Sequence, residues 1–279
     1  MINNITVIIV SYKSKKTIFN CLKSIEHFNK ILILDNSNDK ELKKNLKNKY
    51  SKIKFFLSKT NNGYGAGYNF LLKKVKTPYA LLMTPDTSFK KGTLNKFLLS
   101  LKKFQDNYCL MGPFKQNKIF ALENKKTISE ASLVYGFSMF INMKNINKNN
   151  FFDENIFLYL ENDDFCKRLV DHNEEIYVVP KSKINHLGGK AVSQKFSEEV
   201  ELSRNWHWIW SKFYFKRKHK GYFFALINGL PTFFSAVLKY ILYLIIFNPK
   251  KSKIYLHRAM GYLNAAIGRK SFFRPNIKI

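Results

Sequence analysis

The sequence predicts an α/β fold in which a mostly parallel sheet is flanked by helices and followed by a helical, amphipathic C-terminal extension. Three observations support this prediction. Short apolar runs alternate with helical stretches through the first half of the chain, as in successive βαβ units. Polar or glycine-rich segments follow several of these runs, at the positions where such sheets bind ligands. From Phe213 onward the composition turns basic and aromatic, which is typical of a helix at a membrane surface.

The alternation of strand and helix patterns begins near the first residue. Apolar runs predict strands, and longer periodic stretches predict helices. Strands are expected at 5–10, 31–34, 53–57, 79–83, 132–141, 157–160 and 176–179, and helices at about 17–27, 40–49, 68–75, 93–104 and onward from 161. We therefore assign residues 1–210 to one domain and residues 211–279 to the extension.

The chain is strongly basic. With 48 Lys and Arg against 19 Asp and Glu, its formal charge is +29 at pH 7. Such a surface attracts nucleic acid, an anionic membrane surface or a phosphorylated substrate. The alternative is that the lysines are spread over solvated helix faces without forming a binding surface.

The cysteines indicate the compartment. Cys21, Cys109 and Cys166 are odd in number and far apart, which argues against a disulfide framework and against a zinc site. The chain opens directly into an apolar strand pattern, without the features of a secretion signal. We expect a cytoplasmic protein that is peripheral on the inner face of the cell membrane.

The extension carries an apolar stretch, 222–247, between basic clusters. Asn228, Pro231 and Lys239 interrupt this stretch, so we expect helices that lie in the membrane interface rather than a span. The alternative is a pair of buried helices or a homodimer contact.

Polar side chains end two neighbouring predicted strands. The first strand ends in Val10, Ser11 and Tyr12, and Asp35 and Asp39 follow the second. The carboxylates can accept hydrogen bonds from a base or from ribose hydroxyls, and the backbone near Tyr12 can pair with base carbonyls. We therefore expect a nucleotide here, although strand-end Asp residues are also common in turns.

A glycine-rich segment runs from Asn61 to Asn69, with Gly63, Gly65 and Gly67 just before an expected helix. Glycines at such a place let backbone N–H groups approach an anion at the positive end of the helix. The Lys-Ser/Thr of a phosphate-binding loop does not follow, so a plain glycine-rich loop is the alternative.

Two further residues suggest a cation site. Asp86 follows the apolar strand at 79–83, so its carboxylate would emerge at the ligand-binding edge of the sheet, where a divalent cation could bridge it to a diphosphate. His186 supplies a second ligand if its segment folds back to the same edge, whereas a lone histidine is more often structural.

An acidic helix start lies between these segments. Glu161, Asp164 and Arg168 fall on one helix face, and Asp163 lies in the same first turn. Acidic first turns ordinarily complement the helix dipole. Because the apolar run 157–160 leads straight into Glu161, we expect this carboxylate at the base of a cleft, where it could act as a general base.

Taken in order, these motifs resemble those of the family 2 inverting glycosyltransferases, and the bacterial rhamnosyltransferase branch is the most similar. The resemblance covers nearly all of the first domain. It rests on segments 10–12, 35–39, 61–69, 84–86, 161–168 and 186–189, with 205–208 and the basic-aromatic tail as further similarities. It implies a GT-A fold, with a Rossmann-like, mostly parallel sheet.

The resemblance also implies residue roles. The nucleotide sugar would be bound by Val10, Ser11, Tyr12, Asp35, Asp39, Asn61, Gly63, Gly67, Asn69 and Asp86. Mg²⁺ or Mn²⁺ would lie at Asp86 and His186. Glu161 would deprotonate the acceptor hydroxyl with Asp164 in the catalytic set, and Asp163 and Arg168 would be weaker candidates. The implied reaction is a direct displacement that inverts the anomeric carbon.

Two positions depart from the family pattern. The metal motif begins with Thr84 in place of Asp or Asn, and the frequent Glu-Asp pair reads Glu161-Asn162. An amide does not take a proton near neutral pH, so the base is Glu161, Asp163 or Asp164, and we predict Glu161. The departures keep a catalytically inactive membrane scaffold as an alternative.

The sequence thus predicts a hexosyltransferase that moves rhamnose or another hexose from a nucleoside-diphosphate sugar to a lipid-linked or growing surface glycan. A nucleotidyltransferase fits less well, because an early basic glycine-rich signature does not occur. A nucleic-acid-binding protein would need a basic stripe with interleaved aromatics, and the acidic cluster at 161–164 disfavours it.

Overall fold

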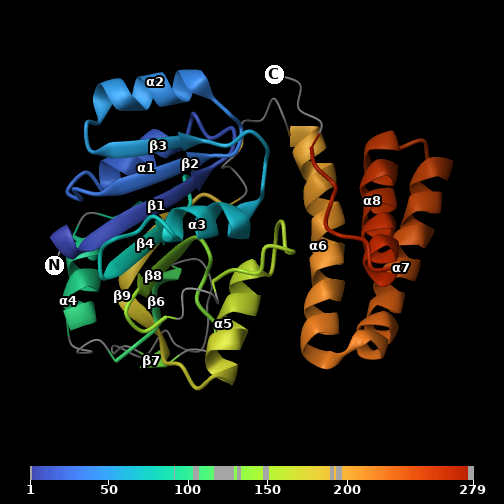
Figure 1. The fold of residues 1–279 in the computed structure, drawn as a ribbon. Coiled ribbons are helices and arrows are strands. Elements are labelled where there is room, and N and C mark those ends of the chain that lie inside the picture. Colours follow the sequence, from blue (N-terminus) through green and yellow to red (C-terminus); the bar gives the residue numbers. More distant parts are fainter. Residues whose placement is uncertain are drawn as a thin grey trace. The chain divides into compact units, whose positions relative to one another are not determined.

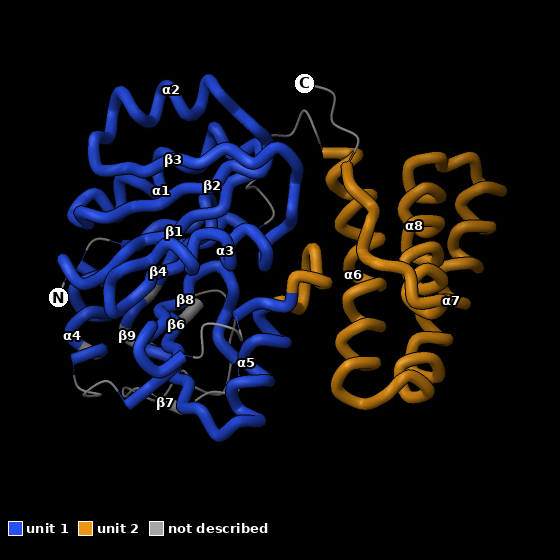
Figure 2. The backbone as a smooth tube through the Cα atoms, viewed as in Figure 1, with its two compact units in different colours: residues 1–153, 162–193 blue, residues 154–161, 194–279 orange. Residues whose placement is uncertain are grey.

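The computed structural model describes residues 2–90, 92–102, 107–115, 129–130, 133–146, 151–188, 192 and 197–275. Ser132, the start of an expected strand, and Gly189, the end of a motif, lie outside these ranges. The chain divides into two compact units (Figure 2), residues 1–153 with 162–193 and residues 154–161 with 194–279. The second unit begins before the expected boundary at 211, because helix α6 (Ser197–Lys220) continues through that position.

One sheet forms the centre of the first unit, with strand order β3-β2-β1-β4-β8-β6-β9-β5 and β7 beside β9 (Figure 1). Its strands are β1 (Ile5–Ser11), β2 (Ile31–Asp35), β3 (Ile53–Leu57), β4 (Tyr79–Met83), β5 (Thr87–Phe89), β6 (Leu110–Lys115), β7 (Ser129–Glu130), β8 (Ser138–Asn142) and β9 (Ile176–His186). β3, β2, β1 and β4 are parallel, as the βαβ pattern predicted. The remaining pairings are antiparallel except for that of β6 with β9, and β9 extends further than expected.

Helices pack on both faces of this sheet, which confirms the expected α/β fold. They are η1 (Ile2–Asn4), α1 (Ile18–Ser24), α2 (Lys40–Lys49), α3 (Tyr64–Leu72), α4 (Thr93–Lys102) and α5 (Glu161–Asp171). Val7 and Ile9 of β1 share a core with side chains of α1, α2 and α4, whereas Ile8 shares a core with side chains of α3 and α5. Successive strand residues point to opposite faces, so a strand covered on both sides is apolar throughout.

Helix α3 begins at Tyr64, earlier than the sequence predicted, so two of the three glycines lie inside it. A Cβ on Gly67 would lie 2.9 Å from Cγ1 of Val10, and one on Gly65 would lie 3.0 Å from Cβ of Phe152. Real Cβ contacts are rarely this short. These glycines therefore allow α3 to pack closely on its neighbours, which is a different role from admitting an anion to a loop.

Residues 157–160 do not form the strand that their apolar character suggested. Tyr159 and Leu160 have φ angles of 72° and 65°, values that a strand residue does not adopt and that non-glycine residues adopt rarely. They make a turn that leads into Glu161, the first residue of α5.

The second unit is helical, as the sequence predicted for the extension. It contains α6, α7 (Tyr222–Ile245) and α8 (Pro249–Ala266), and its core includes Trp206, Trp210, Phe213 and Tyr262. A Cβ on Gly261 of α8 would lie 2.4 Å from the carbonyl oxygen of Trp206, so α6 and α8 are in backbone contact there. Much of α7 stays exposed. Among the residues that the structure describes, α7 is the one helix whose length and composition would allow it to cross a membrane.

Candidate functional site

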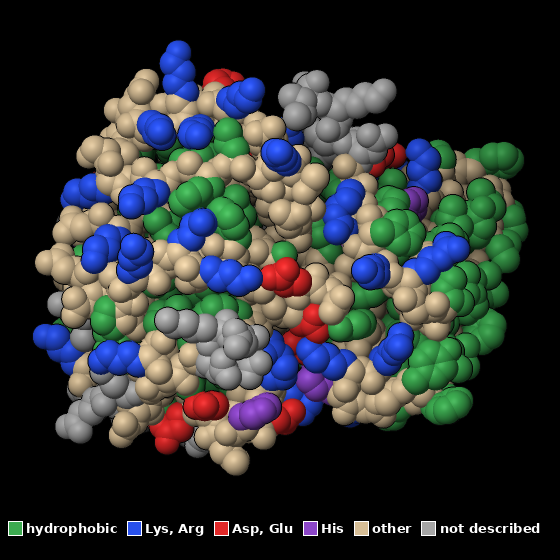
Figure 3. Space-filling view, in the orientation of Figure 1, with side chains coloured by type: hydrophobic (Ala, Val, Ile, Leu, Met, Phe, Trp, Pro, Cys, Tyr) green, Lys and Arg blue, Asp and Glu red, His purple; other side chains and the backbone are tan. Residues whose placement is uncertain are grey.

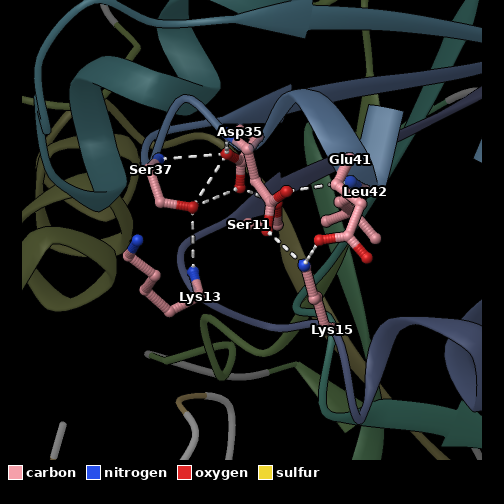
Figure 4. A network of polar contacts seen from close by, with 8 residues as sticks. Ser11, Lys13, Lys15, Asp35, Ser37, Glu41 and Leu42 are labelled. Carbon is pink, nitrogen blue, oxygen red and sulfur yellow. Dashed lines mark hydrogen bonds and ion pairs between the residues drawn. The ribbon is translucent and has the colours of Figure 1, made fainter. Parts of the chain in front are cut away.

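A buried polar network joins the ends of β1 and β2 (Figure 4). Oδ1 of Asp35 accepts a hydrogen bond from the Ser11 hydroxyl at 2.6 Å. Its Oδ2 accepts from the backbone N–H groups of Ser37 at 3.1 Å and Asp39 at 2.8 Å, and the Ser37 hydroxyl donates to the same carboxylate. Asp35 is fully buried, so it holds the loop 35–39 against β1. A direct contact with a nucleotide remains a prediction, and it would have to replace one of these donors.

Asp39 caps helix α2. Its Oδ1 accepts a hydrogen bond from the backbone N–H of Leu42 at 2.8 Å, the geometry of an N-cap. Its Oδ2 lies 3.6 Å from Nζ of Lys15, which also lies 2.5 Å from a carboxylate oxygen of Glu41. The cap explains why α2 begins where it does, and the role of Asp39 in nucleotide binding stays a prediction.

The start of α3 is attached to the same strand ends. Nδ2 of Asn36 donates to the carbonyl oxygen of Gly63 at 2.9 Å, and the Gly63 N–H donates to Oδ1 of Asn61 at 3.1 Å. Gly63 is the N-cap of α3 with a φ of 86°, which favours glycine. Burial raises the pKa of Tyr12, although a hydrogen bond with Asn61 lowers it. Expected nucleotide residues from two segments therefore meet here.

Asn36 is a residue that sequence reasoning did not select. Its Oδ1 atom is buried and has no hydrogen-bond partner among the described residues, so the site contains a buried acceptor directly after β2. Its position inside the 35–39 motif was the available signal.

Asn69, expected to contact a nucleotide, instead binds the backbone of Phe152. Nδ2 donates to the Phe152 carbonyl oxygen at 2.8 Å, and Oδ1 accepts from its N–H at 3.1 Å. The side chain is buried. Asn69 therefore joins α3 to the segment after β8, and Val10 and Gly67 pack on each other beside it. These three residues thus take part in packing and hydrogen bonding, and their contacts with a nucleotide stay predictions.

The expected return of His186 to Asp86 is found. Antiparallel pairing of β5 with β9 sets Thr87 beside His186, and Nε2 of His186 lies 3.4 Å from Oδ2 of Asp86. Burial by itself raises the pKa of Asp86, but the hydrogen bond and charge of His186, with a hydrogen bond from Thr84, outweigh it and hold this pKa below its ordinary value. Thr84, which departs from the family pattern, thus supports an ionised Asp86.

Aromatic stacking fixes the orientation of this imidazole. The Phe137 ring stacks on His186 with centroids 4.6 Å apart, and Tyr135 stacks on Phe137 at 5.4 Å. The hydroxyl of Tyr64, the first residue of α3, donates to the carbonyl oxygen of Gly136 in the same loop. The loop 133–137 therefore connects the start of α3 with the Asp86–His186 pair. Sequence reasoning placed this loop in a strand and missed its role.

The first turn of α5 binds the same loop. Nδ2 of Asn162 donates to the carbonyl oxygen of Val134 at 3.2 Å. Burial, and then the negative charge of Asp163, raise the pKa of Tyr135, so Asp163 lies near this ring. Burial also raises the pKa of Asp163 itself. A half-buried carboxylate thus faces the loop that supports His186.

The other acidic residues of α5 differ in environment. Asp164 is fully buried, and Nε of Arg168 donates to its Oδ2 at 2.8 Å. Arg168 also donates to the carbonyl oxygen of Phe151, so the pair anchors the helix, and a catalytic role for Asp164 stays a prediction. Glu161 is buried as well, with 4% of its surface exposed, at the turn where α5 begins.

Comparison with known proteins finds glycosyltransferases. The model of glycosyl transferase family 2 matches residues 6–166. A curated protein, the low-salt glycan biosynthesis hexosyltransferase Agl10 of Haloferax volcanii, is 23% identical over 202 residues, which are 63% of this chain and 64% of that protein. The chain thus spans less than two thirds of the length of this relative.

Solved structures share the fold. Mannosyltransferase PcManGT from Pyrobaculum calidifontis, in complex with GDP-Man and Mn²⁺, has a TM-score of 0.59 at 11% identity, covering 94% of this chain and 86% of that one. TarS 1-349 of S. aureus has a TM-score of 0.55 at 14% identity, covering 95% and 92%. GalNAc-T7 with UDP, GalNAc and Mn²⁺ has a TM-score of 0.57 at 14% identity, covering 65% of this chain and 42% of that one. At these identities the likeness concerns the fold.

Proposed function

Since the chain belongs to glycosyl transferase family 2 and has a GT-A fold, it is a glycosyltransferase, and we propose that it moves a hexosyl group from a nucleoside-diphosphate sugar to a lipid-linked or growing surface glycan. The observation that carries this proposal is the loop 133–137, which contacts both His186 and the first turn of α5. One element thereby supports both the residues proposed to bind a cation and a group of carboxylates. The preference for rhamnose stays a prediction.

In this proposal a divalent cation lies at Asp86 and His186. One carboxylate oxygen and one imidazole nitrogen 3.4 Å apart suit such an ion, and the imidazole favours Mn²⁺ over Mg²⁺, which takes oxygen ligands. Among the residues described, no group of three His, Cys, Asp or Glu could hold a metal, so the diphosphate and water would complete the coordination. A bound cation would stabilise the departing nucleoside diphosphate electrostatically.

Glu161 is our proposed general base. It begins α5 directly after the turn at Tyr159 and Leu160 and is nearly excluded from solvent. It would take the proton of the acceptor hydroxyl while that oxygen displaces the nucleoside diphosphate at the anomeric carbon, which inverts the configuration. Asp163 is the alternative, because burial raises its pKa toward the range that suits a base. Asn162 cannot serve, because an amide does not take a proton near neutral pH.

The test is nucleotide binding by the purified chain in Mn²⁺, followed as thermal stabilisation by UDP, dTDP, GDP and a random-sequence oligonucleotide. One nucleoside diphosphate at about a hundred times its dissociation constant should stabilise the fold by about 2.7 kcal/mol. The effect should disappear in Asp86→Asn and persist in Asp171→Asn, an exposed acid of α5. Stabilisation by the oligonucleotide alone would contradict the proposal.

We further propose that α7 lies in the surface of an anionic membrane. Phe223, Ile227, Phe234, Leu238 and Ile245 are between 57% and 76% exposed, and their spacings of four and seven residues place them on one helix face. Figure 3 shows apolar side chains gathered over the helical unit beside lysines and arginines. Basic clusters at 216–220 and 250–253 flank the helix, which favours anionic lipid over a second copy of this basic chain.

A further inference from the structure

A cavity of about 230 Å³ opens within the second unit, between α6, α7 and α8. Its apolar lining residues include Ile209, Phe213, Ala225 and Tyr262. Lys212 and Lys216 line the same cavity, together with the polar side chains of Asn228 and Thr232. The cavity therefore offers an apolar wall beside two positive charges.

The two lysines lie four residues apart on α6, so they are neighbours on one helix face, where like charges destabilise a helix. Burial, and then the positive charges of Lys216 and Arg258, lower the pKa of Lys212. In the described part of the chain, no ion pair involves Lys212 or Lys216. An anion bound between them would relieve this repulsion.

The cavity adjoins the turn that precedes Glu161. Leu160 contributes to its lining and has a φ of 65°, a conformation that persists in a non-glycine residue only when its surroundings hold it. The carbonyl oxygen of Leu158 accepts a hydrogen bond from the Ser211 hydroxyl of α6 at 2.8 Å. Helix α6 thus carries both lysines and fixes the segment that leads to the proposed base.

We propose that this cavity binds the phosphate end of a lipid-linked acceptor. Lys212 and Lys216 pair with the phosphate or diphosphate, and the apolar wall takes up the first carbons of the lipid chain. The inference rests on the proposed function and deepens it, because it names the acceptor as an amphiphile whose apolar chain carries a phosphate. Neither a free glycan nor inorganic phosphate has an apolar group that could pack against the apolar wall of the cavity.

The experiment is isothermal titration calorimetry of the full chain with geranyl phosphate, geraniol and inorganic phosphate. Geranyl phosphate should bind at least about tenfold more tightly than either of the others, because each of them offers half of the required contacts. The double variant Lys212→Gln/Lys216→Gln should lose about tenfold or more in affinity for geranyl phosphate, as expected for the loss of charge-assisted hydrogen bonds. Lys44→Gln/Lys47→Gln removes the same charge from exposed positions of α2 in the first unit, and it should bind normally.

A second variant tests the apolar part of the cavity. Thr232 is exposed on α7, so Thr232→Trp should fold and fill the space, lowering the affinity for geranyl phosphate. Equal binding of geranyl phosphate by the double lysine variant, or equal binding of inorganic phosphate and geranyl phosphate by the unmodified chain, would overturn the inference. Binding of a nucleoside diphosphate with Mn²⁺ is measured on the same samples, and its failure in the unmodified chain would refute the proposed function instead.

Discussion

Nε2 of His186 lies 3.4 Å from Oδ2 of Asp86, a contact made across the antiparallel pairing of two strands that are far apart in the chain. The stacked ring of Phe137 supports the imidazole, and Thr84 contributes to the low pKa of Asp86. These contacts hold Asp86 and His186 beside each other, and their expected role in cation binding can be tested by single substitutions.

Replacing His186 by Ala should weaken Mn²⁺-dependent binding of the nucleoside diphosphate by about tenfold to a hundredfold, because one of the two proposed protein ligands is lost. Calorimetry with and without EDTA measures this, and EDTA should remove the difference between the variant and the unmodified chain. His172→Ala, which changes an exposed histidine directly after α5, is the control. Unchanged affinity in His186→Ala would rule out a metal role for this residue.

Glu161→Gln should lower the turnover number by about a hundredfold to ten-thousandfold, the usual contribution of a general base, while donor affinity stays unchanged. Initial rates of nucleoside diphosphate release measure the effect once the donor is known. Asp163→Asn is the matched variant, two residues further along in the first turn of α5. If it loses activity and Glu161→Gln does not, the base is Asp163.

Gly67→Ala should destabilise the first unit by about 1–3 kcal/mol, as is usual for overpacking, because the new methyl group would meet Val10 at 2.9 Å. Urea denaturation followed by circular dichroism measures the change. Ala66→Ser, at a less buried position of the same helix, should cost only about 0.5 kcal/mol through helix propensity. A more stable Gly67→Ala protein would show that α3 does not need this close approach.

His207 should make the stability of the second unit depend on pH. Burial is the main cause that lowers its pKa from 6.5 to about 3, so the unfolded chain takes up a proton that the folded chain excludes. The stabilisation is complete above pH 6.5 and is lost as the pH falls toward about 3, with a slope from this residue of up to about 1.4 kcal/mol per pH unit.

Urea titrations at several pH values from 7.5 to 4.5 measure this dependence. His207→Phe keeps a ring beside Phe157, 4.5 Å away by centroids in the unmodified protein, but loses the hydrogen bond to the Phe273 carbonyl oxygen. Its stability should fall less steeply toward acid pH. Parallel curves for the two proteins would mean that His207 is protonated in the folded state.

Phe223→Glu/Leu238→Glu should abolish flotation of the protein with vesicles that contain phosphatidylglycerol, because both changes place charge on the exposed apolar face of α7. Binding of the unmodified chain should be weaker to phosphatidylcholine vesicles and at high salt, as expected for a basic surface. Leu99→Glu, which alters an exposed leucine of α4 in the first unit, should float normally. Flotation of the double variant would place the membrane contact elsewhere.

Much of the fold could be predicted because its cause is local. Predominantly apolar runs became β1 to β4, and the periodic stretch at 40–49 became α2, so the hydrophobic pattern identified these elements. The turn at Tyr159 and Leu160 was misread as a strand, since composition reports burial and does not report a positive φ. The early start of α3 was missed because its glycines were taken as part of a loop, whereas Gly65 and Gly67 lie inside the helix.

Most of the element types, the family and the polar residues that could form the site follow from the sequence alone, because periodicity and motif order are properties of the chain. The tertiary structure decided which of those residues are open to a ligand. In the folded chain, other protein groups make hydrogen bonds with the side chains of Asp35 and Asn69, and His186 lies beside Asp86. A side chain's hydrogen-bond partners are set by segments distant in sequence, and these meet only when the sheet forms.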